Sequence, residues 1–362
     1  MQRLYLLDLK VLRLPESLGE LKLLEVFDLG VTGLAVLPEG MRNLSSLRTL
    51  RIDCDDLNEL PCSLMGRLSS LKELTIIARR LKTLPDTFGN LSSLRFLKIK
   101  SRELKSLPDS LGCLSRLGVL ELADLPIRTL PESFNKLSAL KNLQFMVCKK
   151  PSLPASFGCG LKLLKELQLY YCSSLKCLPD SFYRLSAVER LSIEHCEDLV
   201  ELGDSFGHLP ALQHLTLHHT GLQRLPSSLW TLSALVELDL RSPFGGSASD
   251  LPGDDDLTFE LPDSFYFPRS LQRLCLALKV LRLPESLGEL VELEELHLKA
   301  TGLEALPTSM RNLSSLRILT IHCIDLKELP CSLMGGLSSL KELTIRAPRL
   351  ESLWTLLDIC HL

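Results

Sequence analysis

The chain has 362 residues, of which 45% are hydrophobic but only 5% aromatic, and its formal net charge is −3. This charge balance argues against a nucleic-acid-binding protein, because no basic stripe runs through the sequence. No apolar run approaches the roughly 20 residues that a membrane-spanning helix needs.

A Leu-Pro step recurs along the chain at intervals of 22 to 25 residues, beginning at Pro15. Gly203 and Trp354 stand where two of the prolines are expected. Self-similarity with such a period is the signature of a solenoid. We therefore predict a single array of about 15 repeats over residues 1–362, with incomplete or uncapped repeats at its ends.

Residues 47–61 illustrate one repeat. Leu50 and Ile52 alternate with charged residues, which predicts a strand with one buried face. Pro61 then predicts the start of a short helical or 3-10 turn, because a proline at the first helical position loses no hydrogen bond. The predicted fold is an α/β solenoid with one strand and one short turn per repeat.

Two stretches carry a more particular pattern. Leu167 to Pro179 reads L-x-L-x-x-C-x-x-L-x-x-L-P, and Leu191 to Leu199 repeats its first part. The chain resembles leucine-rich repeat proteins, and these stretches are similar to the repeats of nucleotide-binding plant disease-resistance receptors. Its Leu-Pro-x-Ser turns also resemble those of Ras-group scaffolds. The resemblance implies a horseshoe with a parallel β-sheet on the concave face and short helical or 3-10 turns on the convex face.

The resemblance also implies a function, namely the sensing and autoinhibitory repeat domain of a plant-type intracellular immune receptor. Its partner would be a pathogen effector, a host guardee or an intramolecular nucleotide-binding domain. The alternatives are a Ras-group scaffold that binds a small GTPase or phosphatase, and a repeat segment of a larger receptor or kinase. The twelve cysteines are scattered and no signal peptide is evident, which favours reduced thiols in the cytoplasm.

One slot of the repeat departs from related proteins, in which a ladder of buried asparagines fills it. Because the regular partner of nearby backbone groups is lost, we expect a looser turn. The residues assigned to this slot are Thr32, Asp55, Arg79, Arg102, Leu125, Cys148, Cys172, Cys196 and Thr220.

The sequence contains none of the phosphate-binding, metalloprotease or nucleophile-elbow motifs, so we expect no enzyme activity and no cofactor. Histidines are the one clustered titratable group, and five of the eight lie within 25 residues. His195 and His219 occupy equivalent slots, about 5 Å apart in a regular sheet. They could share a zinc ion, but only Glu194 could add to them, so a pH-sensitive polar patch is favoured.

The predicted partner site combines the outward residues of the middle repeats with an acidic loop. Two of only five tyrosines are adjacent there, and tyrosine is a frequent binding hot spot. The interval from Pro226 to Pro262 is 36 residues, which predicts a loop insert near 242–260 that is either functional or merely solvated. The predicted site residues are Gln168, Tyr170, Tyr171, Glu194, His195, Thr216, His218, His219 and Arg241, with Asp250, Asp254, Asp255 and Asp256 of the loop.

The sequence also contains an internal duplication. Residues 11–76 and 280–345 are near-copies at an offset of 269. Such an array can lengthen without refolding, because each repeat contacts only its neighbours.

Overall fold

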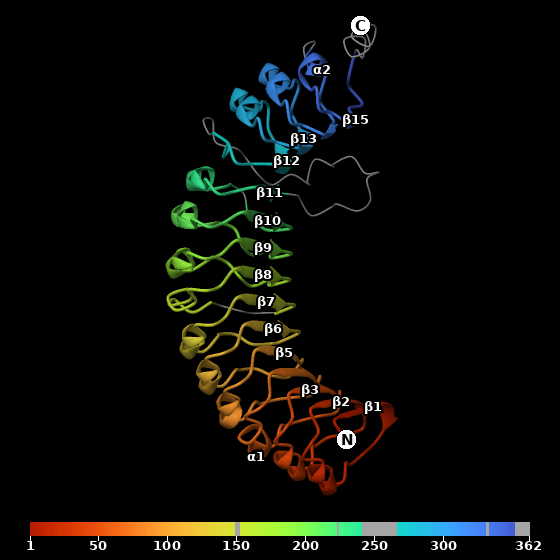
Figure 1. Cartoon of the computed structure of the whole chain (residues 1–362). Coiled ribbons are helices and arrows are strands. Elements are labelled where there is room, and N and C mark those ends of the chain that lie inside the picture. Colours follow the sequence, from red (N-terminus) through yellow and green to blue (C-terminus); the bar gives the residue numbers. More distant parts are fainter. Residues whose placement is uncertain (149–152, 223, 241–265, 331–332, 352–362) are drawn as a thin grey trace. The chain divides into compact units, whose positions relative to one another are not determined.

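The computed structural model describes residues 1–148, 153–222, 224–240, 266–330 and 333–351. These residues belong to two compact units, Met1–Val188 (unit 1) and Glu189–Leu362 (unit 2). Each unit is built from repeats of one strand and one short turn, which confirms the predicted solenoid class (Figure 1).

Within each unit, successive strands lie side by side and pair in parallel (Figure 1). The strands of unit 1 are β1 (Arg3–Lys10), β2 (Val26–Thr32), β3 (Thr49–Asp53), β4 (Glu73–Ile77), β5 (Phe96–Lys100), β6 (Val119–Ala123), β7 (Asn142–Met146) and β8 (Glu166–Tyr170). Those of unit 2 are β9 (Arg190–Glu194), β10 (His214–His218), β11 (Glu237–Leu240), β12 (Arg273–Lys279), β13 (Glu295–Thr301), β14 (Ile318–Cys323) and β15 (Glu342–Arg346).

The strands between β1 and β15 separate a buried side from a solvent-facing side, which we call the strand face, whereas the first and last strands contain no fully buried residue. In β8, Leu167 and Leu169 are buried, whereas Gln168 and Tyr170 are partly exposed. This alternation follows from the two-residue period of a strand. Equivalent leucines of successive repeats therefore line up in the core. It confirms the assignment of residues to core and surface by the Leu-x-Leu spacing.

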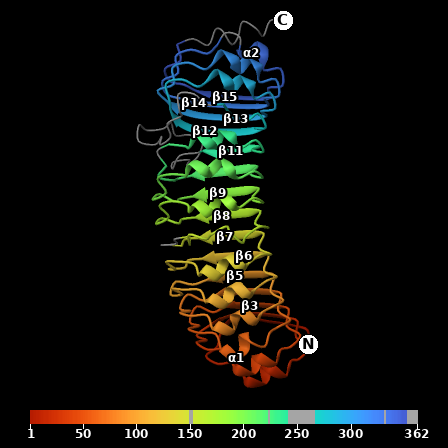
Figure 2. The ribbon, with the colours of Figure 1, turned by 90° about the vertical axis from the view of Figure 1, so that its left-hand side faces the viewer.

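The short turns lie on the side of each unit opposite the strands, and Figure 2 views the molecule from that side. Most are 3-10 helices of five residues, and two are single α-turns, α1 (Cys62–Met65) and α2 (Leu333–Gly336). The 3-10 helices are η1 (Glu16–Glu20), η2 (Glu39–Asn43), η3 (Asp86–Asn90), η4 (Asp109–Cys113), η5 (Glu132–Lys136), η6 (Asp180–Arg184), η7 (Asp204–His208), η8 (Ser227–Thr231), η9 (Glu285–Glu289) and η10 (Thr308–Asn312).

The position of the prolines differs from the prediction by one residue. Pro61 has φ −60° and ψ 129°, so it is the extended N-cap of α1 rather than its first helical residue. Gly203 adopts the same conformation before η7, with φ −65° and ψ 154°. The cap position requires only a φ near that of proline. Glycine can adopt this φ, which explains why glycine can replace proline here.

The slot predicted to replace the asparagine ladder was wrong in the early repeats. There the buried residues are Val31, Cys54, Ala78 and Ser101, each one position before the residue that the spacing indicated. In the middle repeats Leu125, Cys148, Cys172, Cys196 and Thr220 are buried as predicted. The reason is one extra residue after the strand in the middle repeats, which shifts the buried slot by one.

The extra residue adopts a left-handed backbone conformation in each of these repeats. Its φ lies between 52° and 56° at Asp124, Val147, Tyr171, His195 and His219. We call these five positions the left-handed row. Its N–H groups continue the sheet ladder within each unit, as when Val147 donates to the Tyr170 carbonyl at 2.9 Å.

Buried thiols supply part of what the missing asparagines would have provided. Cys172 Sγ lies 3.7 Å from the Tyr170 carbonyl oxygen and Cys196 Sγ lies 3.5 Å from that of Glu194. Burial raises the pKa of the Cys148 thiol to about 12, so this thiol stays protonated and can donate.

Candidate functional site

Unit 1 exposes an apolar patch at the ends of β7 and β8. Met146 lies directly opposite Tyr170 in the sheet register, and Val147 and Tyr171 follow them in the left-handed row. Tyr171 is 51% exposed, and Met146 and Val147 are each 37% exposed. Because large apolar side chains are exposed together here, we call Met146, Val147, Tyr170 and Tyr171 the apolar patch.

A polar hollow of about 170 Å³ lies on the same strand face, toward the beginnings of β6, β7 and β8. Gln144 and Gln168 lie opposite each other in register, and the Asn142 amide donates to a Glu166 carboxylate oxygen at 2.5 Å. The hollow is lined by Val119, Leu120, Glu121, Asn142, Leu143, Gln144, Glu166 and Gln168. Amide donors and acceptors therefore adjoin the apolar patch.

Val147 is the β-branched member of the left-handed row, with φ 56°. A left-handed conformation brings Cβ close to the following carbonyl oxygen, and only glycine, asparagine and aspartate tolerate it readily. The repeat imposes this conformation, since the Val147 N–H must reach the Tyr170 carbonyl. Backbone strain of this kind is often found where a side chain serves binding rather than stability.

Val147→Asn is therefore expected to stabilise unit 1 by about 1 kcal/mol, because asparagine relieves the left-handed strain. Val147→Thr is the matched control, since it keeps the β-branch and should bring no gain. Urea unfolding measured by circular dichroism compares the midpoints. Equal midpoints for both variants would show that the strain is not the cause.

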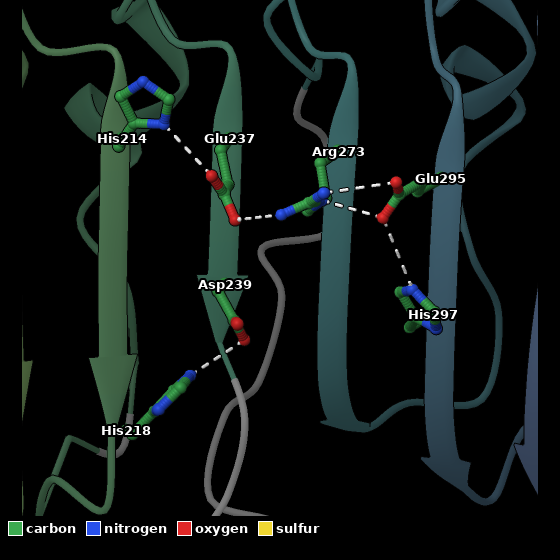
Figure 3. Close-up of polar contacts among 7 residues, drawn as sticks. All are labelled: His214, His218, Glu237, Asp239, Arg273, Glu295 and His297. Carbon is green, nitrogen blue, oxygen red and sulfur yellow. Dashed lines mark hydrogen bonds and ion pairs between the residues drawn. The ribbon is translucent and has the colours of Figure 1, made fainter. Parts of the chain in front are cut away.

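In unit 2, His218 lies between two carboxylates of neighbouring strands. Its Nε2 is 2.9 Å from Asp239 Oδ1, and its Nδ1 is 3.8 Å from Glu194 Oε2 (Figure 3 shows the first contact). Asp239 is only 5% exposed although it occupies an outward position of β11. The imidazole of His218, followed by the hydrogen bond from Ser192, lowers the pKa of the Glu194 carboxyl against the effect of burial.

His195 and His219 stack in the left-handed row, with ring centroids 4.0 Å apart and planes inclined by 31°. This is close to the separation that their equivalent slots predicted. Burial, followed by the charge of His195, lowers the pKa of the His219 imidazole, which favours its neutral form. Within the described residues, no group of three or more His, Cys, Asp or Glu side chains is arranged to bind a metal ion.

A chain of polar contacts crosses β10 to β13 on the strand face of unit 2 (Figure 3). Glu237 lies 3.0 Å from His214 Nδ1 and 3.1 Å from Arg273 Nη1, and Arg273 Nε lies 2.8 Å from Glu295. His297 Nε2 ends the chain 3.9 Å from Glu295. The two carboxylates, Glu295 first, raise the pKa of the Arg273 guanidinium.

The sequence model of a family described as "Leucine-rich repeat region" matches residues 84–198. A leucine-rich repeat protein of Leptospira interrogans shares the fold with a TM-score of 0.76 at 24% identity, over 94% of this chain and 83% of that one. The chain has the leucine-rich repeat fold.

Two plant receptors share the repeat fold at lower similarity. The plant peptide hormone receptor RGFR1, solved with RGF2, aligns with a TM-score of 0.54 and 19% identity over 96% of this chain and 67% of that one. The repeat ectodomain of the receptor kinase GASSHO1/SCHENGEN3 from Arabidopsis thaliana aligns with a TM-score of 0.58 and 20% identity over 96% and 47%. No curated protein matched the sequence.

The residues of the predicted site belong to both units. Gln168, Tyr170 and Tyr171 lie together on the strand face or left-handed row of unit 1. The predicted residues of unit 2 that lie on β9 and β10 or directly after them are Glu194, His195, Thr216, His218 and His219. Arg241, Asp250, Asp254, Asp255 and Asp256 lie outside the described residues.

Sequence reasoning missed the carboxylates that pair with the histidines, namely Glu237, Asp239 and Glu295. Each occupies an outward strand slot, so the repeat spacing alone could have identified them as surface neighbours.

In the part of the chain that the structure describes, no helix has the length and apolar character to cross a membrane.

Proposed function

We propose that this leucine-rich repeat protein is a non-catalytic recognition module whose unit 1 binds a protein partner through the apolar patch and the polar hollow. The observation that carries the proposal is the joint exposure of Met146, Val147 and Tyr171 beside Tyr170. Aromatic side chains provide large contact areas at low entropic cost and dominate the energetics of many interfaces.

The surroundings of the patch support this use. Lys98 pairs with Glu121 at 2.8 Å, and Lys100 pairs with Asp124 at 3.4 Å, so the neighbouring charges of the strand face are neutralised. A partner can therefore cover the apolar patch without burying unpaired charge, while the amides of the hollow offer hydrogen bonds. An apolar centre with a polar rim is the usual anatomy of a protein interface.

We further propose that the module is the sensing and autoinhibitory domain of a plant-type intracellular immune receptor, which places it in the cytoplasm. The L-x-L-x-x-C pattern of residues 167–179 and 191–199 supports this resemblance, and both stretches meet the matched family region, 84–198. The partner would be a pathogen effector, a host guardee or the receptor's own nucleotide-binding domain.

Replacing Tyr170 and Tyr171 together by alanine is expected to weaken partner binding by about 2 kcal/mol or more, since both rings would be lost from the centre of the interface. The wild-type chain is immobilised as bait and exposed to plant cytosolic extract, and mass spectrometry identifies the proteins that it captures. Titration calorimetry with each purified candidate then gives the affinity of wild type and variant.

Leu163→Ala is the matched control, because Leu163 is also 51% exposed in unit 1 but lies in the turn before β8. It should leave the affinity unchanged. If the tyrosine variant binds every captured protein as tightly as wild type, the apolar patch is not the interface. Capture of a small GTPase would favour a Ras-group scaffold instead of an immune receptor.

A further inference from the structure

The internal duplication allows two versions of the same surface to be compared within one chain. The first copy contributes β2, β3 and β4 of unit 1, and the second contributes β13, β14 and β15 of unit 2. The register is equivalent in both, since Gly30 lies opposite Asp53 as Lys299 lies opposite His322. The two triplets of strands therefore present matched outward positions.

The buried positions of the two copies are similar, whereas their outward positions have diverged. Ile52 and Cys54 correspond to the identical Ile321 and Cys323 in the core. The row nearest the strand ends differs completely. It reads Gly30, Asp53 and Ile77 in the first copy and Lys299, His322 and Arg346 in the second.

The two copies also differ in how their charges are balanced. In the first copy, Arg51 lies 2.9 Å from Asp53 and 3.6 Å from Asp28. In the second, neither Lys299 nor Arg346 has a carboxylate within ion-pair distance among the described residues. The second copy therefore presents positive charges that no carboxylate among the described residues neutralises.

The acidic group that follows β14 is engaged elsewhere. Asp325 accepts a hydrogen bond from the Gly302 N–H at 2.7 Å and pairs with Arg349 at 2.5 Å. Burial, followed by the positive charges of Arg346 and Lys299, lowers the pKa of the His322 imidazole, with His297 adding a smaller effect. We call Lys299, His322 and Arg346 the basic row.

We propose that the basic row of β13–β15 binds an acidic peptide segment of a protein partner, lying extended across the three strands. Neighbouring strands are about 4.8 Å apart, so Lys299 and Arg346 are separated by about 10 Å. A peptide in the extended polyproline II conformation advances about 3.1 Å per residue with three residues per turn, so acidic residues three positions apart lie on one side about 9 Å apart and match this separation. Thr320 and Thr344, one row away, offer hydroxyl groups to the same peptide.

This surface is distinct from the apolar patch of unit 1, so either proposal can fail without the other. The test uses the full chain and a fluorescein-labelled peptide with a Glu-Ser-Ser-Glu centre and glycine flanks. A Gln-Ser-Ser-Gln peptide is the matched probe, and fluorescence anisotropy measures both affinities. We expect binding of the acidic peptide only, weakening as salt is added, since exposed charges are screened.

The copies themselves supply the variants. Lys299→Gly, His322→Asp and Arg346→Ile together install the row of the first copy, and binding should weaken at least about tenfold. Changing the same three residues to glutamine keeps the strands polar and should give the same loss. This second variant decides the question if the first one does not fold.

The reciprocal graft tests sufficiency. Gly30→Lys, Asp53→His and Ile77→Arg should create a second peptide site in unit 1. A Cβ at Gly30 would lie 3.2 Å from Cδ2 of the exposed Leu7, which can move aside, and 3.9 Å from the nearest backbone atoms. Unchanged binding after the glutamine substitutions, equal binding of the glutamine peptide, or tighter binding of a single-stranded oligonucleotide would each overturn the proposal.

Discussion

Phe157→Ala is expected to lower the free energy of unfolding of unit 1 by about 3–5 kcal/mol, the cost of removing a large ring from a packed core. Phe157 is fully buried, in the turn segment between β7 and β8. Its ring stacks between Phe134 at 6.2 Å and Phe182 at 6.1 Å, with the planes inclined by 24° and 16°. Removing it leaves a cavity that three consecutive repeats share.

Chemical denaturation of the full chain measures this loss, and Phe157→Leu is the control. Leucine keeps most of the apolar contact but not the stacked ring, so its cost should be clearly smaller. Because a repeat contacts only its neighbours, the transition of unit 1 should shift more than that of unit 2. A loss below about 1 kcal/mol for alanine would mean that the neighbouring turns collapse into the space.

The repeat period made this core predictable from the sequence. A Leu-Pro step followed by x-Ser-Phe places each phenylalanine in the same slot of consecutive turns, as at Phe134 and Phe157. The alternation around Leu167 and Leu169 likewise identified the buried side of the strands. Such features depend only on spacing along the chain, which explains why sequence reasoning found them.

The ends of the strands were less predictable, because one extra residue changes which position is buried. Counting a fixed distance from Ile52 placed Asp55 inside, whereas the structure buries Cys54. The same count is right for Cys172, since Tyr171 there takes the left-handed conformation. Valine and tyrosine are not typical of such a conformation, so the left-handed row could not be predicted from residue type.

The sequence predicted which residues belong to the candidate sites, but not how their charges are paired. Tyr170, Tyr171 and His218 were selected as outward residues, and they are at least partly exposed. Spacing places His218 and Asp239 on the outward side of successive strands, but their contact depends on side-chain positions, which spacing did not supply. For the same reason the basic row became visible only when Lys299 and Arg346 could be set against the carboxylates around them.

Gly288→Ala is expected to destabilise unit 2 by about 2–3 kcal/mol, because the new methyl group would overlap backbone. A Cβ at Gly288 would lie 2.2 Å from the Ser309 carbonyl oxygen and 2.4 Å from Ser309 Cβ. No rotamer change can relieve a contact with the main chain, so η9 and η10 would have to separate. The close approach of these turns is therefore the reason for glycine at this position.

Separating the turns has a second, measurable consequence. Glu285 accepts a hydrogen bond from the Ser309 N–H at 2.9 Å, and the contacts with Ser309 hold the pKa of the Glu285 carboxyl below its usual value. In Gly288→Ala we expect this pKa to rise toward the ordinary value, which NMR titration of the carboxyl would detect. A simple loss of stability without displacement of η10 would leave the pKa of Glu285 where it is.

Gly118→Ala is the matched control for the loss of a glycine. The nearest backbone atom to a Cβ at Gly118 is the Arg95 carbonyl oxygen at 3.6 Å, an ordinary contact. Since alanine also restricts the unfolded chain, this variant should be neutral or stabilise by about 0.4–1 kcal/mol. If both glycine variants lose the same stability, backbone freedom rather than close packing of successive turns explains the glycines of this array.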